Sequence, residues 1–164
     1  MTPTLYFLRS SENKIVNDML KYAHPNLSNP EIYSQFYGLS TKDLGLYALI
    51  DNKIAGAIWC RKLKEEDGAE AFIDAETPIV SFAVLPEFRK KGVGKAMMQQ
   101  FLLEAGTSYE GLSIKSPLTK ETQDFLKDFG FQPLKKDSTI LFKELEKKEL
   151  IRPSDGYDAR KWMD

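Results

Sequence analysis

The sequence predicts a single α/β domain built on one mixed β-sheet, and three observations lead to that fold class. Apolar segments with strand character are interspersed with segments of helical periodicity in the order β-α-α-β-β-β-α-β-α-β-β. The chain has 164 residues, which is long enough for one domain with a sizeable core. Hydrophobic residues make up 42% and charged residues 29% of the sequence, as in ordinary globular proteins. We therefore expect about six to seven strands and about four flanking helices.

The N-terminal elements are a strand and two short helices. Residues 5–9 have strand character, and apolar side chains at helical spacing predict a helix over residues 13–22. Either Ser10 or Ser11 could cap that helix, because a serine hydroxyl accepts a hydrogen bond from an unpaired N–H group of the first turn. Pro30 begins a second short helix, because its fixed φ angle suits the first turn.

Residues 44–50 and 53–59 are two apolar runs that predict a β-hairpin. The two residues between them, Asp51 and Asn52, tolerate the positive φ angles of a tight hairpin turn. A charged loop follows, and residues 69–75 could pair as a short extra strand. The hairpin makes this part of the expected sheet antiparallel.

The C-terminal half is predicted to complete the sheet. Residues 112–114 form a strand, and residues 119–128 form a helix with Gly130 just past its end, in a C-cap position. Residues 131–145 supply a closing hairpin. The remaining tail, residues 146–164, is expected to be either docked on this or another subunit or disordered.

Charge and cysteine content exclude several classes of partner. The net charge is −1, so no global basic field would recruit nucleic acid or an anionic membrane. The single cysteine, Cys60, allows no intrachain disulfide. The sequence has no signal-peptide pattern and no apolar stretch of about 18 residues. We therefore expect a cytoplasmic monomer or homodimer with no nucleic-acid partner, no membrane partner and no metal site.

The most informative segment joins a strand over residues 77–85 to a helix over residues 93–105. After Pro86, a basic loop leads to the helix and brings two glycines, Gly92 and Gly94. Such a joint leaves backbone N–H groups unpaired at the helix N-terminus, where the helix dipole favours an anion. Glycine lets the main chain approach that anion closely, because a Cβ atom would obstruct it. The segment therefore predicts a binding site for a pyrophosphate.

The spacing narrows the kind of anion site. A P-loop needs a glycine at the position of Arg89 and a Ser or Thr at the position of Ala96. The dinucleotide fingerprint needs a third small residue where this chain has Met97. What remains is R-x-x-G-x-G after a strand that ends V-x-P. The alternative is a plain charged connection, since basic residues and glycines often form surface turns.

This pattern resembles motif A of the GNAT superfamily of N-acetyltransferases, with Arg89, Gly92 and Gly94 at its defining positions. The order of elements is also similar to that family over about residues 5–145. The resemblance implies one GNAT domain over residues 1–145. It also implies a central sheet that is splayed between the fourth and fifth strands.

A second stretch resembles motif B of the same family, with Phe125, Gly130 and Phe131 at matching positions. The motif therefore supports the resemblance independently of the glycine loop. The departures are Thr119 where the family has Asn, Thr122 where it has Ala, and Leu126 where it has Tyr.

The resemblance implies an acetyl-CoA-dependent N-acetyltransferase, in which a primary amine of a small molecule or peptide attacks the thioester directly in a ternary complex. The pantetheine arm would run along the fourth strand like a further strand, and a backbone N–H there would stabilise the developing oxyanion. The pyrophosphate would sit on the amides of residues 90–95. The implied contacts to coenzyme A are Phe82, Ala83, Val84, Arg89, Lys90, Lys91, Gly92, Val93, Gly94, Lys95, Thr119, Thr122 and Phe125.

The implied reaction needs two proton transfers. An alkylammonium with a pKa near ~10.4 must lose its proton to a carboxylate or a bridging water before it can attack. Asp74 and Glu76 lie just before the central strand, where the family often places a base, and Glu76 is the preferred catalytic base because it is nearer the strand. The family's tyrosine usually protonates the leaving thiolate, which Leu126 cannot do. Other possible donors are Ser116, Thr122 and Tyr109.

The missing tyrosine keeps a second function open, namely a non-catalytic acyl-CoA-binding module that acts as a sensor or scaffold. Gly56, Trp59 and Arg61 resemble the third strand of an unassigned bacterial type within the superfamily, whose acceptor amine is not defined. Trp59 and Arg61 share one strand face. They either line the acceptor groove or form a core Trp with an Arg at the rim.

Overall fold

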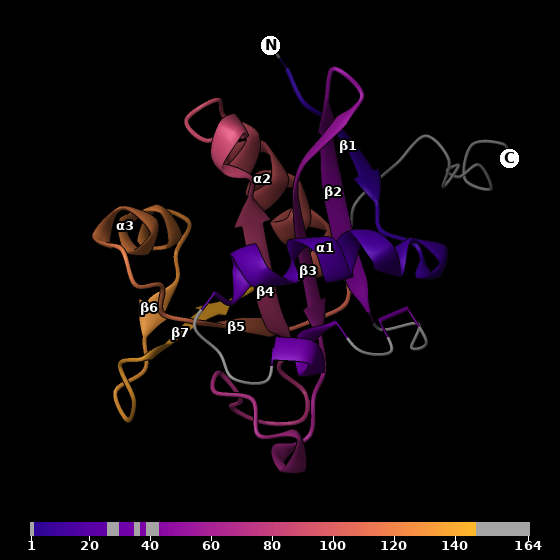
Figure 1. Cartoon of the computed structure of the whole chain (residues 1–164). Helices are drawn as coiled ribbons and strands as arrows, with labels where there is room; N and C mark the ends of the chain where they lie inside the picture. Colours follow the sequence, from indigo (N-terminus) through magenta and orange to yellow (C-terminus); the bar gives the residue numbers. More distant parts are fainter. Residues whose placement is uncertain (1, 26–29, 35–36, 39–42, 147–164) are drawn as a thin grey trace, which may run out of the picture.

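The computed structural model describes residues 2–25, 30–34, 37–38 and 43–146, which form one seven-stranded sheet with helices packed on both faces (Figure 1). The strand order is β1-β2-β3-β4-β5-β7-β6, and neighbours are antiparallel except for the parallel pair β4–β5. The predicted mixed α/β sheet is therefore confirmed. The elements are β1 (Thr4–Phe7), α1 (Asn13–Ala23), β2 (Leu44–Ile50), β3 (Lys53–Arg61), β4 (Ile79–Val84), α2 (Val93–Ala105), β5 (Gly111–Lys115), α3 (Lys120–Asp128), β6 (Gln132–Pro133) and β7 (Ile140–Glu144).

Turn chemistry that can be read from the sequence sets several element boundaries. Asp51 and Asn52 join β2 to β3 with φ angles of 51° and 65°, as the predicted hairpin turn requires. Gly130 has a φ of 97° directly after α3, in the left-handed region that glycine enters without strain. The predicted closing hairpin is also confirmed, since β6 pairs with β7.

The start of α1 differs from the expectation. Ser10 and Ser11 do not cap the helix but lie in a 3-10 turn that precedes it. The carboxylate of Glu12 accepts the backbone N–H of Arg9 at 2.9 Å and so closes this turn. Glu12 is the N-cap residue of α1, but its side chain makes no capping hydrogen bond to the first turn of that helix.

Two further local predictions are wrong. The second helix is only a 3-10 turn over Pro30–Tyr33 within the described residues. Residues 69–75 form turns rather than a strand. The carbonyl of Ala71 accepts the Ser113 hydroxyl at 2.9 Å, so a side chain of β5 holds this loop instead of a strand ladder. The predicted tail lies outside the described residues from position 147 onward.

The sheet separates two hydrophobic clusters. Side chains of α1, including Val16 and Met19, pack on the face of β4 that carries Ile79 and Ala83. The opposite face carries Val80 and packs against α2 and α3. Successive side chains of a strand point to opposite faces, so β4 contributes alternately to both clusters. Buried on both sides, this strand is held firmly in the centre of the molecule.

The sheet opens between β4 and β5. Only Ile79 and Ser113 are in register across this pair, with the Ser113 N–H donating to the Pro78 carbonyl at 3.0 Å. Beyond that point β5 pairs with β7 along its whole length and leaves β4. The part of β4 after Ile79 therefore has no strand partner on its β5 side among the described residues, and the expected splay between the fourth and fifth strands is confirmed.

Candidate functional site

The connection from β4 to α2 presents a row of unpaired backbone donors. It passes through a short 3-10 turn, and Lys90 and Gly92 then adopt positive φ angles of 62° and 83° before the helix begins. The first backbone hydrogen bond of α2 runs from the Ala96 N–H to the Gly92 carbonyl at 3.0 Å. Within the described part of the chain, the N–H groups of residues 90–95 donate no hydrogen bond. These donors and the helix dipole suit an anion.

Positive side chains surround these donors. Lys90, Lys91 and Lys95 are exposed, and none of them forms an ion pair with another described residue. Arg89 is also exposed, but its Nε donates to the Val84 carbonyl at 3.1 Å. A phosphate at the helix start would therefore meet cationic groups that no carboxylate already neutralises.

The open edge of β4 carries a second set of unpaired backbone groups. The Leu85 N–H donates to the Ala55 carbonyl on β3 at 2.8 Å, so it points away from the splay. Because the peptide is planar and trans, the Val84 carbonyl must point into the splay. In an antiparallel ladder the N–H and carbonyl of one residue face the same side, so the N–H groups of Val84 and Phe82 also face the splay. These are the two N–H groups of β4 that a bound thioester could reach.

Aromatic rings line the same opening. Phe82 stacks on Phe125 of α3 with ring centroids 5.5 Å apart and an angle of 12° between the rings, and Phe129 packs against Phe125 at 5.0 Å. A Cβ atom at Gly94 would lie 3.0 Å from the Phe82 ring and 3.6 Å from the Phe125 ring. Gly94 therefore leaves room for these rings as well as for an approaching ligand.

Thr119 and Thr122 take part in capping α3. The Thr119 hydroxyl accepts the Thr122 N–H at 3.3 Å and donates to the Thr122 hydroxyl at 2.9 Å. A threonine at the position of the family's asparagine thus performs the helix cap. Both residues lie at the start of the helix that carries Phe125.

The two candidate bases lie at the paired end of β4. Asp74 accepts the Glu76 N–H and the Thr77 hydroxyl through one oxygen, each at 2.9 Å, and so shapes the turn that leads into the strand. The side chain of Glu76 is 84% exposed and pairs with Lys62 at 2.8 Å. Asp74 therefore has a local structural role, whereas the carboxylate of Glu76 remains at the surface.

The candidate acids have different surroundings. Leu126, at the position of the family's tyrosine, is fully buried in the cluster beneath α2 and α3, so that position faces the core. Tyr109 is buried as well, and burial raises the pKa of its hydroxyl. Ser116 is half-buried next to β5, where its N–H donates to the Thr139 carbonyl. No single hydroxyl stands out as a replacement.

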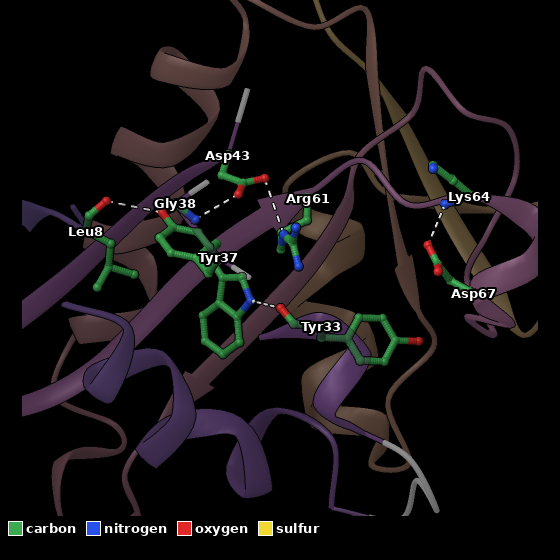
Figure 2. A network of polar contacts seen from close by, with 9 residues as sticks. Leu8, Tyr33, Tyr37, Gly38, Asp43, Arg61, Lys64 and Asp67 are labelled. Atoms are coloured by element: carbon green, nitrogen blue, oxygen red, sulfur yellow. Dashed lines mark hydrogen bonds and ion pairs between the residues drawn. The ribbon is translucent and has the colours of Figure 1, made fainter. Parts of the chain in front are cut away.

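Trp59 and Arg61 are engaged inside the protein rather than in a groove. The Trp59 indole is fully buried and donates to the Tyr33 carbonyl at 2.7 Å. The Arg61 guanidinium pairs with Asp43 at 3.3 Å, with only 14% and 4% of the two side chains exposed (Figure 2). Asp43 also accepts the Gly38 N–H at 2.8 Å. This network joins the ends of β2 and β3, so the core interpretation holds for Trp59 and the Arg61 side chain is largely buried.

His24, the residue directly after α1, contacts the centre of β4. It is 8% exposed, and its Nε2 lies 2.7 Å from the Ser81 hydroxyl. Its ring stacks on Tyr33 with centroids 4.0 Å apart. The contact joins residues 57 positions apart, so no spacing pattern could have predicted it. Its one sequence signal was that it is the chain's single histidine.

Comparison with known proteins places this geometry in a family. The sequence profile of the acetyltransferase (GNAT) domain matches residues 42–133, which is more than half of the chain. No curated protein sequence matches the chain. None of the described helices is long and apolar enough to cross a membrane.

Several solved structures share the fold at low sequence identity. A GNAT phosphinothricin acetyltransferase (Pat) from Sinorhizobium meliloti, in complex with AcCoA, is 15% identical with a TM-score of 0.67 over 95% of each chain. A GNAT-family acetyltransferase from Staphylococcus aureus is 13% identical with a TM-score of 0.65, over 88% of this chain and 100% of the other. An IAA acetyltransferase from Bacillus cereus is 16% identical with a TM-score of 0.63, over the same shares. These identities bear on the fold alone.

Proposed function

Because the chain belongs to the GNAT acetyltransferase family, we propose that it transfers an acetyl group from acetyl-CoA to a primary amine of a small molecule or peptide. The observation that carries this proposal is a pair of unpaired donor sets at one end of β4, namely the N–H groups of residues 90–95 and those on the open edge of the strand. The first group suits the diphosphate. The second suits the amides of the pantetheine arm, which would add to β4 as a strand does.

The open edge of β4 would also serve the chemical step. The N–H of Phe82 or Val84 would donate to the thioester carbonyl and stabilise the negative charge that develops there. The amine nitrogen forms a bond to the carbonyl carbon, and the C–S bond breaks to release the thiolate of coenzyme A. A thiolate with a pKa near ~8.5 can leave without a proton donor, which fits the buried Leu126. The proton of the amine would pass to a carboxylate or a water molecule. Glu76 precedes β4 at the end opposite Leu85, so it could serve only an amine bound at that end, and an amine next to Leu85 would need another acceptor.

The amine would approach over the α1 face of the sheet. A surface cavity of about 380 Å³ lies there between α1 and the residue after β4. Its volume is in the range of small-molecule sites. It offers both charged and apolar contacts through Asn17, Asp18, Met19, Lys21, Tyr22 and Leu85.

A pair of glycine variants tests the anion site. Gly92 and Gly68 both have positive φ angles, and a Cβ at either would meet no atom within 4 Å, so valine strains both backbones alike. Only Gly92 lies at the start of α2. We expect Gly92→Val to weaken acetyl-CoA binding at least about tenfold by calorimetry, and Gly68→Val to leave it unchanged. Equal affinities for the wild type and both variants would show that the anion site is assigned wrongly.

The buried Leu126 favours a second candidate, a module that binds acyl-CoA without catalysis. A thiol-release assay with a panel of amines and peptides separates the two functions. Release of coenzyme A above the rate of hydrolysis with any amine supports the transferase. Tight acetyl-CoA binding without release across the panel supports the module. Restoring tyrosine at position 126 would not decide the matter, because its ring would overpack the core.

A further inference from the structure

We propose that Arg89 is a specificity-determining residue that controls access to the open edge of β4. It admits thioesters that carry phosphate groups and disfavours pantetheine thioesters that lack them. The inference rests on the proposed function and adds a selection step to it. It concerns the side chain of Arg89, which the resemblance implies only as a contact to coenzyme A.

Arg89 covers an acceptor that the pantetheine arm would need. Its Nε donates to the Val84 carbonyl at 3.1 Å. That carbonyl points into the splay, because the Leu85 N–H of the same peptide points to β3. The side chain thus occupies the open edge of β4 next to the N–H of Val84.

Few other acceptors exist on this edge. Beyond the single registered pair of β4 and β5, the carbonyls of Val80, Phe82 and Val84 face the splay before the chain turns at Pro86. Pantetheine has two amide groups, each with an N–H that needs an acceptor once it is withdrawn from water. An arm that runs along β4 as far as its C-terminal end therefore competes with Arg89 for Val84.

The result of this competition depends on the phosphates. Arg89 directly precedes the unpaired N–H groups of residues 90–95, so a diphosphate bound there lies within reach of its side chain. A hydrogen bond between a guanidinium and a phosphate is roughly twice as strong as one to a neutral carbonyl. Coenzyme A would thus draw Arg89 away from Val84 and use the carbonyl it releases. A ligand without phosphates offers Arg89 no charged acceptor in place of the Val84 carbonyl.

The test compares two thioester probes on the same variants. Wild type and Arg89→Ala are titrated with acetyl-CoA and with S-acetylpantetheine, and backbone amide signals are followed by NMR, which also detects weak binding. We expect Arg89→Ala to weaken acetyl-CoA binding roughly tenfold, because a charged contact to phosphate is lost. The same variant should bind S-acetylpantetheine about fivefold more tightly, because the Val84 carbonyl is uncovered.

Lys91→Ala is the matched control. It removes one positive charge from the same loop, but the Lys91 side chain makes no contact with Val84 among the described residues. It should weaken acetyl-CoA binding a few-fold and leave S-acetylpantetheine binding as in the wild type. Melting temperatures of both variants check that the fold is intact.

The outcomes separate this inference from the proposed function. If Arg89→Ala changes both affinities in the same direction, or gains nothing for S-acetylpantetheine, Arg89 does not control the groove. That result would leave acetyl-CoA binding by the wild type, and hence the proposed function, in place. If the wild type fails to bind acetyl-CoA at all, both proposals fall together.

Discussion

At the scale of single residues, burial sets the chemistry of His24. Burial and, to a lesser extent, the charge of Lys115 lower the pKa of His24 from 6.5 to about 4. The ring is therefore neutral at pH 7, which allows it to share a hydrogen bond with Ser81 inside the protein. A group with so low a pKa is a poor acceptor for the proton of an amine.

The same shift predicts a pH-dependent stability. The unfolded chain binds this proton with a pKa near 6.5 and the folded chain only near 4, so the unfolded state takes up more protons between these values. Stability from this group is complete above about pH 6.5 and is lost as the pH falls towards 4, by at most roughly 3 kcal/mol. Urea unfolding of wild type and His24→Gln at pH 7, 5.5 and 4.5 measures it. The difference between the two proteins should shrink as the pH falls, and a constant difference would contradict this origin.

At the scale of elements, β4 has two unlike edges. The edge that faces β3 is fully paired from Ile79 to Val84. The other edge is paired only at its start, because β5 turns away to follow β7. A strand in the middle of the sheet therefore carries backbone groups that would otherwise be found only on an edge strand. Burial of both of its faces holds these groups in place for a ligand.

Hydrogen exchange of backbone amides should reveal the two edges. We expect the N–H groups of Phe82 and Val84 to exchange much faster than those of Ser81 and Ala83, which face β3. Saturating acetyl-CoA should slow the first pair and leave the second pair nearly unchanged. NMR-detected exchange resolves each amide separately. Equal protection of all four amides without ligand would show that the edge is already paired.

At the scale of the whole molecule, the two ends of the central strands have different tasks. Arg61 and Asp43 lie at the end of the sheet where β3 meets the start of β4, since Arg61 is in register with Ile79. The anion site lies at the other end, beyond Val84. The largely buried ion pair and the Trp59 hydrogen bond at the first end hold strands and loops together. Residues that stabilise the fold are thus separated from those that would bind coenzyme A.

This separation predicts that stability can be lost without loss of binding. Asp43→Asn removes the negative charge that faces Arg61, and we expect the free energy of unfolding to fall by roughly 3 kcal/mol. Asp18→Asn is the control, because its ion pair with Lys14 is exposed and should contribute less than about 0.5 kcal/mol. Urea titrations give both values. The affinity of Asp43→Asn for acetyl-CoA, measured well below its melting temperature, should equal that of the wild type, and a large change would contradict the separation.

Features that depend on local chemistry could be predicted from the amino-acid sequence. The bounds of α2, the Asp51-Asn52 turn and the glycine after α3 follow from backbone preferences that neighbouring residues impose. The order of strands and helices, together with the glycine loop, was enough to predict the mixed sheet and its splay through the resemblance to one family.

Contacts between distant residues became visible only in the folded protein. The pairing of Arg61 with Asp43, the contact of His24 with Ser81 and the covering of Val84 by Arg89 leave no periodic trace in the sequence. The loop over residues 69–75 looked like a strand because most of its residues are apolar, yet the Ser113 hydroxyl, not a neighbouring strand, binds its backbone. Local backbone preferences select the helices, strands and turns. Burial and hydrogen bonding between these elements decide which polar groups are paired within the protein and which remain available to a ligand.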